Sequence, residues 1–143
     1  MYSKEASVKI KKEFWTNFGK SFPRKWLLYR TKIKDFGFKF VADNKKAMVC
    51  LDIEPKDDFY KEYYFDKIVS LKNILINDYI NDVIFDANYV LENGKSICRI
   101  YTKFPNKFSI HNKNTWLEAY EFFVENMSNF EAFFYEYEDY IKN

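Results

Sequence analysis

Residues 36–54 read FGFKFVADNKKAMVCLDIE and predict a β-hairpin. With Asn44 and Lys45 as a two-residue turn, the apolar side chains of both strands fall on one face. That face holds Phe36, Phe38, Phe40, Ala42, Ala47, Val49, Leu51 and Ile53. The opposite face receives Lys39, Asp43, Lys46, Asp52 and Glu54. A one-residue slip would mix the two faces, so the pattern fixes the register.

A second hairpin is predicted around Asn93 and Gly94, a strong two-residue turn signal. With the turn at these two residues, the expected core face holds Phe85, Ala87, Tyr89, Leu91, Cys98 and Ile100. Asp86, Asn88 and Arg99 fall on the other face. Two hairpins with one apolar face each are typical of an antiparallel sheet that is covered on one side.

Three helices and one further strand are predicted in the rest of the chain. Apolar residues recur at helical spacing in residues 3–20, from residue 58 to about 79, and from about 112 to 141. Thr115 and Glu118 fit a capping box for the last helix. Residues 26–31, WLLYRT, read as a strand, and residues 104–110 as a possible short edge segment.

The expected fold is α+β, in the element order α-β-β-β-α-β-β-α. It has an antiparallel sheet of about five strands, with the helices packed on one face. We expect a single domain over residues 1–143, a length that buries a sizeable core without disulfides or metal.

The last helix carries an apolar stripe in which spacings of four and three alternate. The stripe is formed by Trp116, Tyr120, Phe123, Met127, Phe130, Phe134 and Tyr137. Leu117, Val124 and Phe133 widen it beyond what one sheet face is expected to cover. We therefore expect these residues to form an interface, most simply in a homodimer.

Charge is distributed unevenly along the chain. Residues 1–34 carry ten Lys and Arg against two Glu, a net charge of +8, and residues 114–143 carry one Lys against seven Asp and Glu, a net charge of −6. The two ends either lie beside each other or mark a surface for an anionic partner. The candidates for binding nucleic acid are Lys9, Lys12, Lys20, Arg24, Lys25, Arg30, Lys32 and Lys34, with Trp26 or Tyr29 as stacking groups.

One pattern is compatible with a metal-dependent nuclease. Glu54 and Lys56 stand two residues apart at the end of a predicted strand, and Asp35 lies opposite that end. Such an enzyme uses carboxylates to hold a divalent ion and a lysine to help activate water. Asp43 belongs to the distant hairpin turn, and Pro55 interrupts the strand.

Other catalytic candidates lack partners in the sequence. His111 stands beside no nucleophile that spacing identifies, and Cys50 and Cys98 lack the spacing of a redox or zinc motif. We therefore expect no metal and no cofactor, and leave enzymatic activity open. The chain has too few glycines for a Gly-rich phosphate loop, with three Gly and three Pro in all. Its content of 48% hydrophobic residues excludes a disordered chain.

The sequence also predicts a cytoplasmic protein without a membrane segment. No signal-peptide pattern opens the chain, and no apolar run approaches the length of about 20 residues that spans a bilayer. Two cysteines in such a chain are expected to be free thiols.

The chain resembles the small bacterial proteins of the family called domain of unknown function 4268. The matching segments span nearly the whole chain: residues 1–5 and 11–15, Trp26 with Tyr29 and Thr31, residues 33–35 and 42–47, residues 93–95 and 99–101, and residues 112–113 with Trp116. The resemblance implies an α+β domain with no agreed activity and no catalytic motif. Longer relatives carry a similar domain at the C-terminus of proteins that look nuclease-like or linked to DNA defence, which implies a DNA-related accessory role.

The function expected first is that of a non-enzymatic protein-interaction domain that self-associates. The alternative is a nucleic-acid-binding accessory module linked to DNA restriction or repair. The second alternative is a divalent-metal-dependent nuclease.

Overall fold

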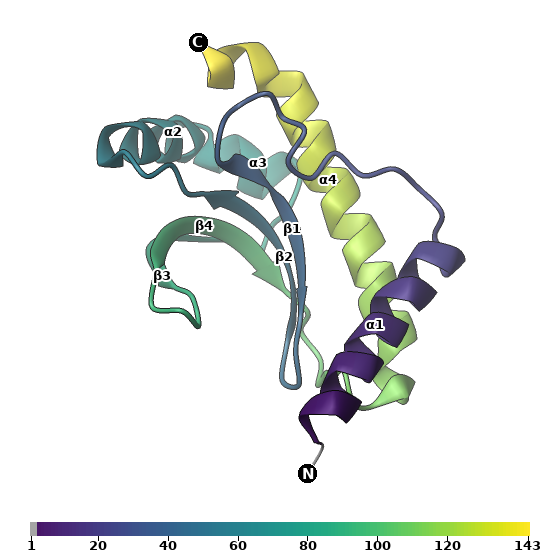
Figure 1. Cartoon of the computed structure of the whole chain (residues 1–143). Helices are drawn as coiled ribbons and strands as arrows, with labels where there is room; N and C mark the ends of the chain where they lie inside the picture. The colour runs from purple at the N-terminus through teal and green to yellow at the C-terminus, as the bar shows by residue number, and fades with distance from the viewer. Residues whose placement is uncertain (1–2) are drawn as a thin grey trace.

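The computed structural model describes residues 3–143, which form an α+β fold with four helices and one antiparallel sheet (Figure 1). The sheet has four strands in the order β1-β2-β4-β3, so the expected fifth strand is absent from the described residues. In chain order the elements are α1 (Lys4–Ser21), β1 (Phe36–Ala42), β2 (Ala47–Ile53), α2 (Asp58–Ser70), α3 (Lys72–Asp78), β3 (Ile84–Val90), β4 (Ser96–Lys103), the 3-10 turn η1 (Lys113–Thr115) and α4 (Trp116–Lys142).

The first hairpin has the predicted register, from Phe36 opposite Ile53 to Ala42 opposite Ala47. Its turn is held by Asp43, whose Oδ1 accepts the backbone N–H of both Lys45 and Lys46 at 2.8 Å. This agreement has a local cause, because the alternation of apolar residues and the turn chemistry both lie within 19 consecutive residues.

Residues 26–31 do not form the predicted strand. Residues 22–35, here called the strap, run irregularly past α4 to reach β1 (Figure 1). Leu28, Lys32 and Asp35 adopt left-handed backbone angles, with φ of 48°, 66° and 55°, which a strand excludes. The backbone N–H of Phe38 donates to Leu28 O at 2.9 Å, so the strap meets the edge of β1 without forming a ladder. Trp26 is buried, and its apolar character reflects core packing and not strand formation.

The β3–β4 hairpin differs from its predicted register. Gly94 has a φ of 85°, and Leu91 pairs with Lys95, which gives a loop of three residues in place of two. A second irregularity lies between Asp86 and Tyr89. The predicted placement of Tyr89 on the core face is therefore wrong, and its ring packs on Arg99, 4.4 Å from the guanidinium carbon. Residues 104–110 add no strand.

The predicted second helix is divided into α2 and α3. The backbone N–H of Leu71 bonds Ile68 O, three residues back, which ends α2. This break lets Ile68, Leu71 and Leu75 all enter the core. The capping box predicted for α4 is also wrong, because the side chain of Thr115 makes no cap bond and its hydroxyl donates to Asn112 O at 2.7 Å.

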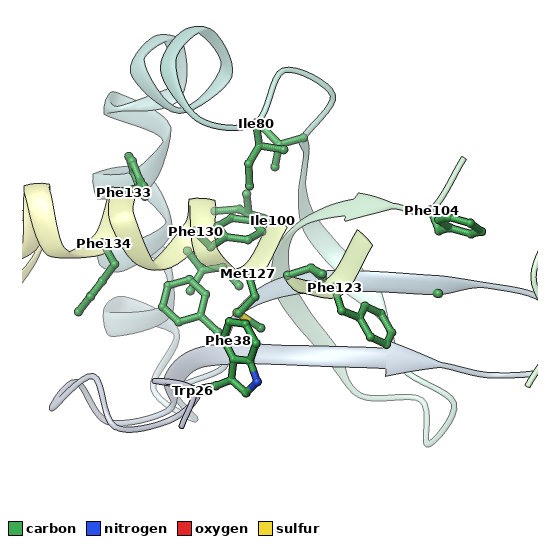
Figure 2. Close-up of a cluster of buried hydrophobic side chains, with 14 of the residues drawn as sticks. Trp26, Phe38, Ile80, Ile100, Phe104, Phe123, Met127, Phe130, Phe133 and Phe134 are labelled. Atoms are coloured by element: carbon green, nitrogen blue, oxygen red, sulfur yellow. The ribbon is translucent and has the colours of Figure 1, made fainter. Parts of the chain in front are cut away.

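The apolar stripe of α4 lies inside the core of the single chain. Trp116, Tyr120, Phe123, Met127, Phe130 and Phe134 are buried, and Tyr137 is half-buried. Figure 2 shows Phe38 of β1 together with side chains of α4, among them Met127 and Phe130. None of the helices within residues 3–143 combines the length and the apolar character that crossing a membrane requires.

Helix α1 covers the aromatic side chains of α4 that the sequence analysis expected a partner subunit to cover. Phe14 meets Trp116 edge-on at a centroid distance of 5.1 Å, and Phe18 meets Phe123 at 5.5 Å. The hydroxyl of Tyr120 donates to Phe14 O at 2.6 Å. The aromatic width of α4 is thus largely used within one chain, which removes the physical reason for placing an interface on this stripe.

Candidate functional site

A cavity of about 690 Å³ opens between the strap, the segment after β2 and helix α2. It is lined by Lys34, Asp35, Pro55, Lys56, Asp57, Tyr60 and Tyr64. Two separate sequence predictions meet in this lining. Lys34 comes from the nucleic-acid set, and Asp35 and Lys56 come from the nuclease pattern. The volume lies in the range of small-molecule sites, and four of the seven lining residues are charged.

The backbone around the cavity explains why these residues converge. Glu54 N–H donates to Asp35 O at 2.8 Å, which continues the pairing of the first hairpin beyond its strands. Pro55 then ends the ladder, since it has no N–H to donate. Asp57 begins α2 immediately, because its Oδ1 accepts the N–H of Phe59 at 2.9 Å. The first turns of α2 therefore stand beside the end of the strap.

Aromatic side chains extend from the cavity to the surface of α2. Phe59, Tyr60, Tyr63 and Tyr64, here called the aromatic ladder, form consecutive ring contacts at centroid distances of 5.1–6.3 Å. Tyr64 joins the ladder to the core through Phe36 at 5.8 Å. At the other end, 67% of Phe59 and 52% of Tyr60 are exposed. Exposed rings held in contact with one another form a surface on which a further ring can stack.

Part of the acidic charge around the cavity is engaged locally. Asp57 caps α2, and Asp58 lies 3.6 Å from the ammonium group of Lys61. Within residues 3–143, Lys34, Lys56 and Asp35 take part in no ion pair. The cavity therefore presents two ammonium groups and two carboxylates to a ligand, and one oxygen of the Asp57 carboxylate is engaged by the Phe59 N–H.

Glu54 does not share in the cavity lining. Burial, with smaller contributions from the nearby carboxylates of Asp52 and Glu54, raises the pKa of Tyr29 to about 12. Glu54 thus lies near Tyr29 on the sheet face away from the helices. In the part of the chain that the structure describes, no three His, Cys, Asp or Glu side chains come together as metal ligands.

The other nucleic-acid candidates are dispersed over α1 and the strap. Lys9, Lys12, Lys20, Lys25 and Lys32 are exposed. Arg24 is engaged within the chain, since its guanidinium pairs with Glu131 and donates to Ser128 Oγ at 2.8 Å. Arg30 donates to Trp26 O at 2.7 Å, and the ring of Trp26 is buried.

Sequence reasoning missed a buried ion pair on the sheet face away from the helices. Arg99 Nε and Nη2 donate to the two carboxylate oxygens of Asp52 at 2.7 and 2.9 Å. Burial opposes the charge of Arg99, but the hydrogen bonds to Asp52 and the nearby negative charges, that of Asp52 among them, together outweigh it and raise the pKa of Arg99. The pair forms across neighbouring strands β2 and β4. The ion pair could be predicted only from the pairing of β2 with β4, which the patterns of the two hairpins do not reveal.

Three further polar candidates lie apart from the cavity. Burial raises the pKa of both Cys50 and Cys98, which keeps these thiols protonated and unreactive. His111 is half-buried near the start of η1, and its backbone N–H donates to Ser109 Oγ at 3.2 Å. None of the three belongs to the cavity lining.

Fold and cavity together define a small α+β domain with a tyrosine-lined site at one end of its sheet. A model of the family described as Domain of unknown function (DUF4268) matches residues 10–138, which is most of the chain. The chain belongs to this family. No curated protein and no solved structure gives a significant match.

Proposed function

We propose that this domain binds single-stranded nucleic acid at the cavity and the aromatic ladder, as a non-enzymatic accessory module. The observation that carries the proposal is the exposure of Phe59 and Tyr60 beside a cavity lined by Lys34 and Lys56. Neither feature alone is specific. Stacking surfaces and unpaired cations on one site are the combination that single-strand-binding proteins use.

The ladder supplies the stacking part of the interaction. Phe59 and Tyr60 project from the first turns of α2, and the rings behind them are fixed by contacts that reach Phe36 in the core. A base stacked on such a ring contributes about 1–3 kcal/mol, with little dependence on which base it is. Rings that are already held in place lose little conformational freedom on binding.

The charged groups supply the remaining contacts. Lys34 of the strap and Lys56 after β2 both line the cavity, where they can contact phosphates of a bound strand. Asp35 lies beside Lys34 and can accept a hydrogen bond from the exocyclic amino group of cytosine. The site therefore favours a single strand, whose bases are free to stack on the ladder, over a duplex, whose bases are already stacked.

Fluorescence anisotropy with labelled oligonucleotides of about 12 nucleotides tests this function. We expect oligocytidine to bind more tightly than the corresponding duplex at about 50 mM salt. The logarithm of the association constant should fall with the logarithm of salt concentration, by a slope of about −0.7 for each lysine contact. Absence of single-strand binding at low salt contradicts the proposal.

A protein partner is the second candidate, and the open edge of β1 described below favours it. Self-association stays a prediction, although most of the α4 stripe is buried in one chain, so a dimer would have to use another surface. We also infer a cytoplasmic location, which the two free cysteines support, since free thiols suit a reducing compartment.

A further inference from the structure

The outer edge of β1 carries backbone groups without hydrogen-bond partners. In an antiparallel pair, alternate residues direct their N–H and C=O toward the neighbouring strand. The backbone N–H and C=O of Phe38 point away from β2, because this N–H donates to Leu28 O in the strap. The same alternation directs the N–H and C=O groups of Phe40 and Ala42 outward. Within residues 3–143, no hydrogen bond from another residue reaches these groups.

Space for an added strand lies along this edge. A cavity of about 550 Å³ borders the edge at residues 39–43 and is also lined by Lys11 and Trp15 of α1. It extends over the sheet face away from the helices to Lys46, Arg99 of β4 and the end of the β3–β4 hairpin. Trp15 and Phe40 form one apolar wall, with ring centroids 6.4 Å apart, and Val41 and Tyr89 belong to the lining on the other face of the strand. An extended peptide directs alternate side chains to its two sides, so it would fill both walls.

The charge of the lining selects among peptides. Lys11 and Lys39 are in no ion pair with a described residue. Asp43 is engaged by two N–H groups of its own turn and by the ammonium group of Lys46, 3.6 Å away. Arg99 is neutralised by Asp52, which leaves Glu92, at the far hairpin, as the remaining acidic group of the lining. The lining therefore complements negative charge.

We propose that β1 binds an extended acidic segment of a partner protein, which adds to the sheet as a fifth strand. Main-chain hydrogen bonds to Phe40 and Ala42 hold the segment. Apolar side chains on one side of the segment contact Trp15 and Phe40. Acidic side chains contact Lys11 and Lys39. This site lies on other elements than the aromatic ladder, and it does not depend on nucleic-acid binding.

A labelled peptide of about eight residues with alternating glutamate and valine is the probe for this site. We expect saturable binding to the full chain by fluorescence anisotropy, and loss of binding when alternate amides of the peptide are N-methylated. A lysine–valine peptide of the same length should not bind. Equal binding of the methylated peptide, or no binding up to about 1 mM, overturns the proposal.

The substitution Ala42→Pro tests the backbone contact directly. It removes an outward N–H that makes no bond within the chain, and proline is tolerated in edge strands at such positions. We expect an unchanged circular-dichroism spectrum and binding weakened by about tenfold or more, the effect of one lost hydrogen bond together with the steric block. Undiminished binding by a folded Ala42→Pro variant overturns the proposal.

The pair Lys11→Glu and Lys39→Glu tests the charge selection, with Lys9→Glu and Lys12→Glu on exposed positions of α1 as the matched control. We expect the first pair to abolish binding of the acidic peptide and the control pair to retain most of it. Equal loss in both pairs contradicts a local site. Sedimentation of the wild-type chain as a dimer that Ala42→Pro dissociates would replace the partner segment by a second copy, and would also overturn the proposal.

Discussion

At the scale of single residues, Gly37 shows how a tertiary contact selects a side chain. A Cβ built on Gly37 lies 2.3 Å from Cδ1 of Tyr29, so the Tyr29 ring occupies the place of a side chain on β1. This close approach links the strap to the sheet face away from the helices. This contact could not be predicted from the sequence, because it joins a strand to an irregular segment.

We expect Gly37→Ala to destabilise the fold by about 1–3 kcal/mol, because the added methyl group and the Tyr29 ring overlap. In a Tyr29→Ser background the same substitution should cost much less, since Tyr29 is half-exposed and its removal opens the space. Urea unfolding of the four variants in a double-mutant cycle measures the coupling. The same cost in both backgrounds contradicts the contact.

The buried hydroxyl of Tyr120 predicts that the free energy of unfolding falls at alkaline pH. Burial raises its pKa to about 12, with a smaller contribution from Glu13, and its hydroxyl donates to Phe14 O. In the unfolded chain the phenol loses its proton near pH 10. The unfolded state therefore binds fewer protons above pH 10, and the free energy of unfolding falls between about pH 10 and pH 12, by up to about 2 kcal/mol. Below pH 10 the contribution is fully present.

Urea unfolding at several alkaline pH values, compared with Tyr120→Phe, isolates this contribution. Other groups titrate equally in both proteins, so the difference between them belongs to Tyr120. We expect the stability of the phenylalanine variant to fall less steeply above pH 10. Parallel curves for the two proteins contradict the assignment.

At the scale of elements, the strap is held to α4 by a single buried carboxylate. Glu131 is 4% exposed; its Oε2 accepts the N–H of Leu27 at 2.7 Å, and its other oxygen pairs with Arg24. Arg24 also stacks on Trp26, 4.1 Å from the ring centroid. These bonds position a segment that has no regular structure of its own, and the end of that segment forms a wall of the cavity.

Glu131→Ala should therefore destabilise the protein by about 2 kcal/mol, because it leaves the Leu27 N–H without an acceptor. Glu131→Gln should cost less, since its amide oxygen can still accept that bond. Glu136→Ala, an exposed position of the same helix, is the control and should change stability by less than about 0.5 kcal/mol. Faster hydrogen exchange at Leu27 in the alanine variant alone would confirm the site of the effect, and equal exchange in all three would contradict it.

The elements also show what a sequence can and cannot predict here. The first hairpin was predicted residue by residue, because its register depends on neighbours in the chain. The strand predicted for residues 26–31 does not form, because Trp26 is apolar for core packing and the left-handed backbone of Leu28 leaves no mark in the sequence. Tyr89 was placed on the wrong face because one irregularity in β3 reverses the alternation beyond it.

The candidate site was predicted in part, for the same reason. Asp35 and Lys56 were singled out by residue type, and Lys34 by the charge of its segment. Their convergence with Tyr60 depends on the path of the strap and on the short connection into α2, which are tertiary features. The exposure of Phe59 could not be read from the sequence, in which it resembles any core aromatic.

At the scale of the whole molecule, the basic and acidic ends of the chain lie together. The strap crosses α4 (Figure 1), and the ion pair of Arg24 with Glu131 joins the basic segment to the acidic one. The charge asymmetry is thus partly satisfied inside one chain. Unpaired lysines remain over α1 and the strap. The cavity of Lys34 and Lys56 and the β1 edge are the two surfaces to which we assign partners.

The measurement that tests the central claim most directly is the affinity for labelled oligocytidine in two matched pairs of variants. Lys34→Ala with Lys56→Ala alters the cavity, and Lys20→Ala with Lys9→Ala removes the same number of positive charges from α1. We expect the first pair to weaken binding by about tenfold or more and the second by about threefold or less, with both folds intact. Equal affinity of the cavity pair and the wild-type protein would contradict the account.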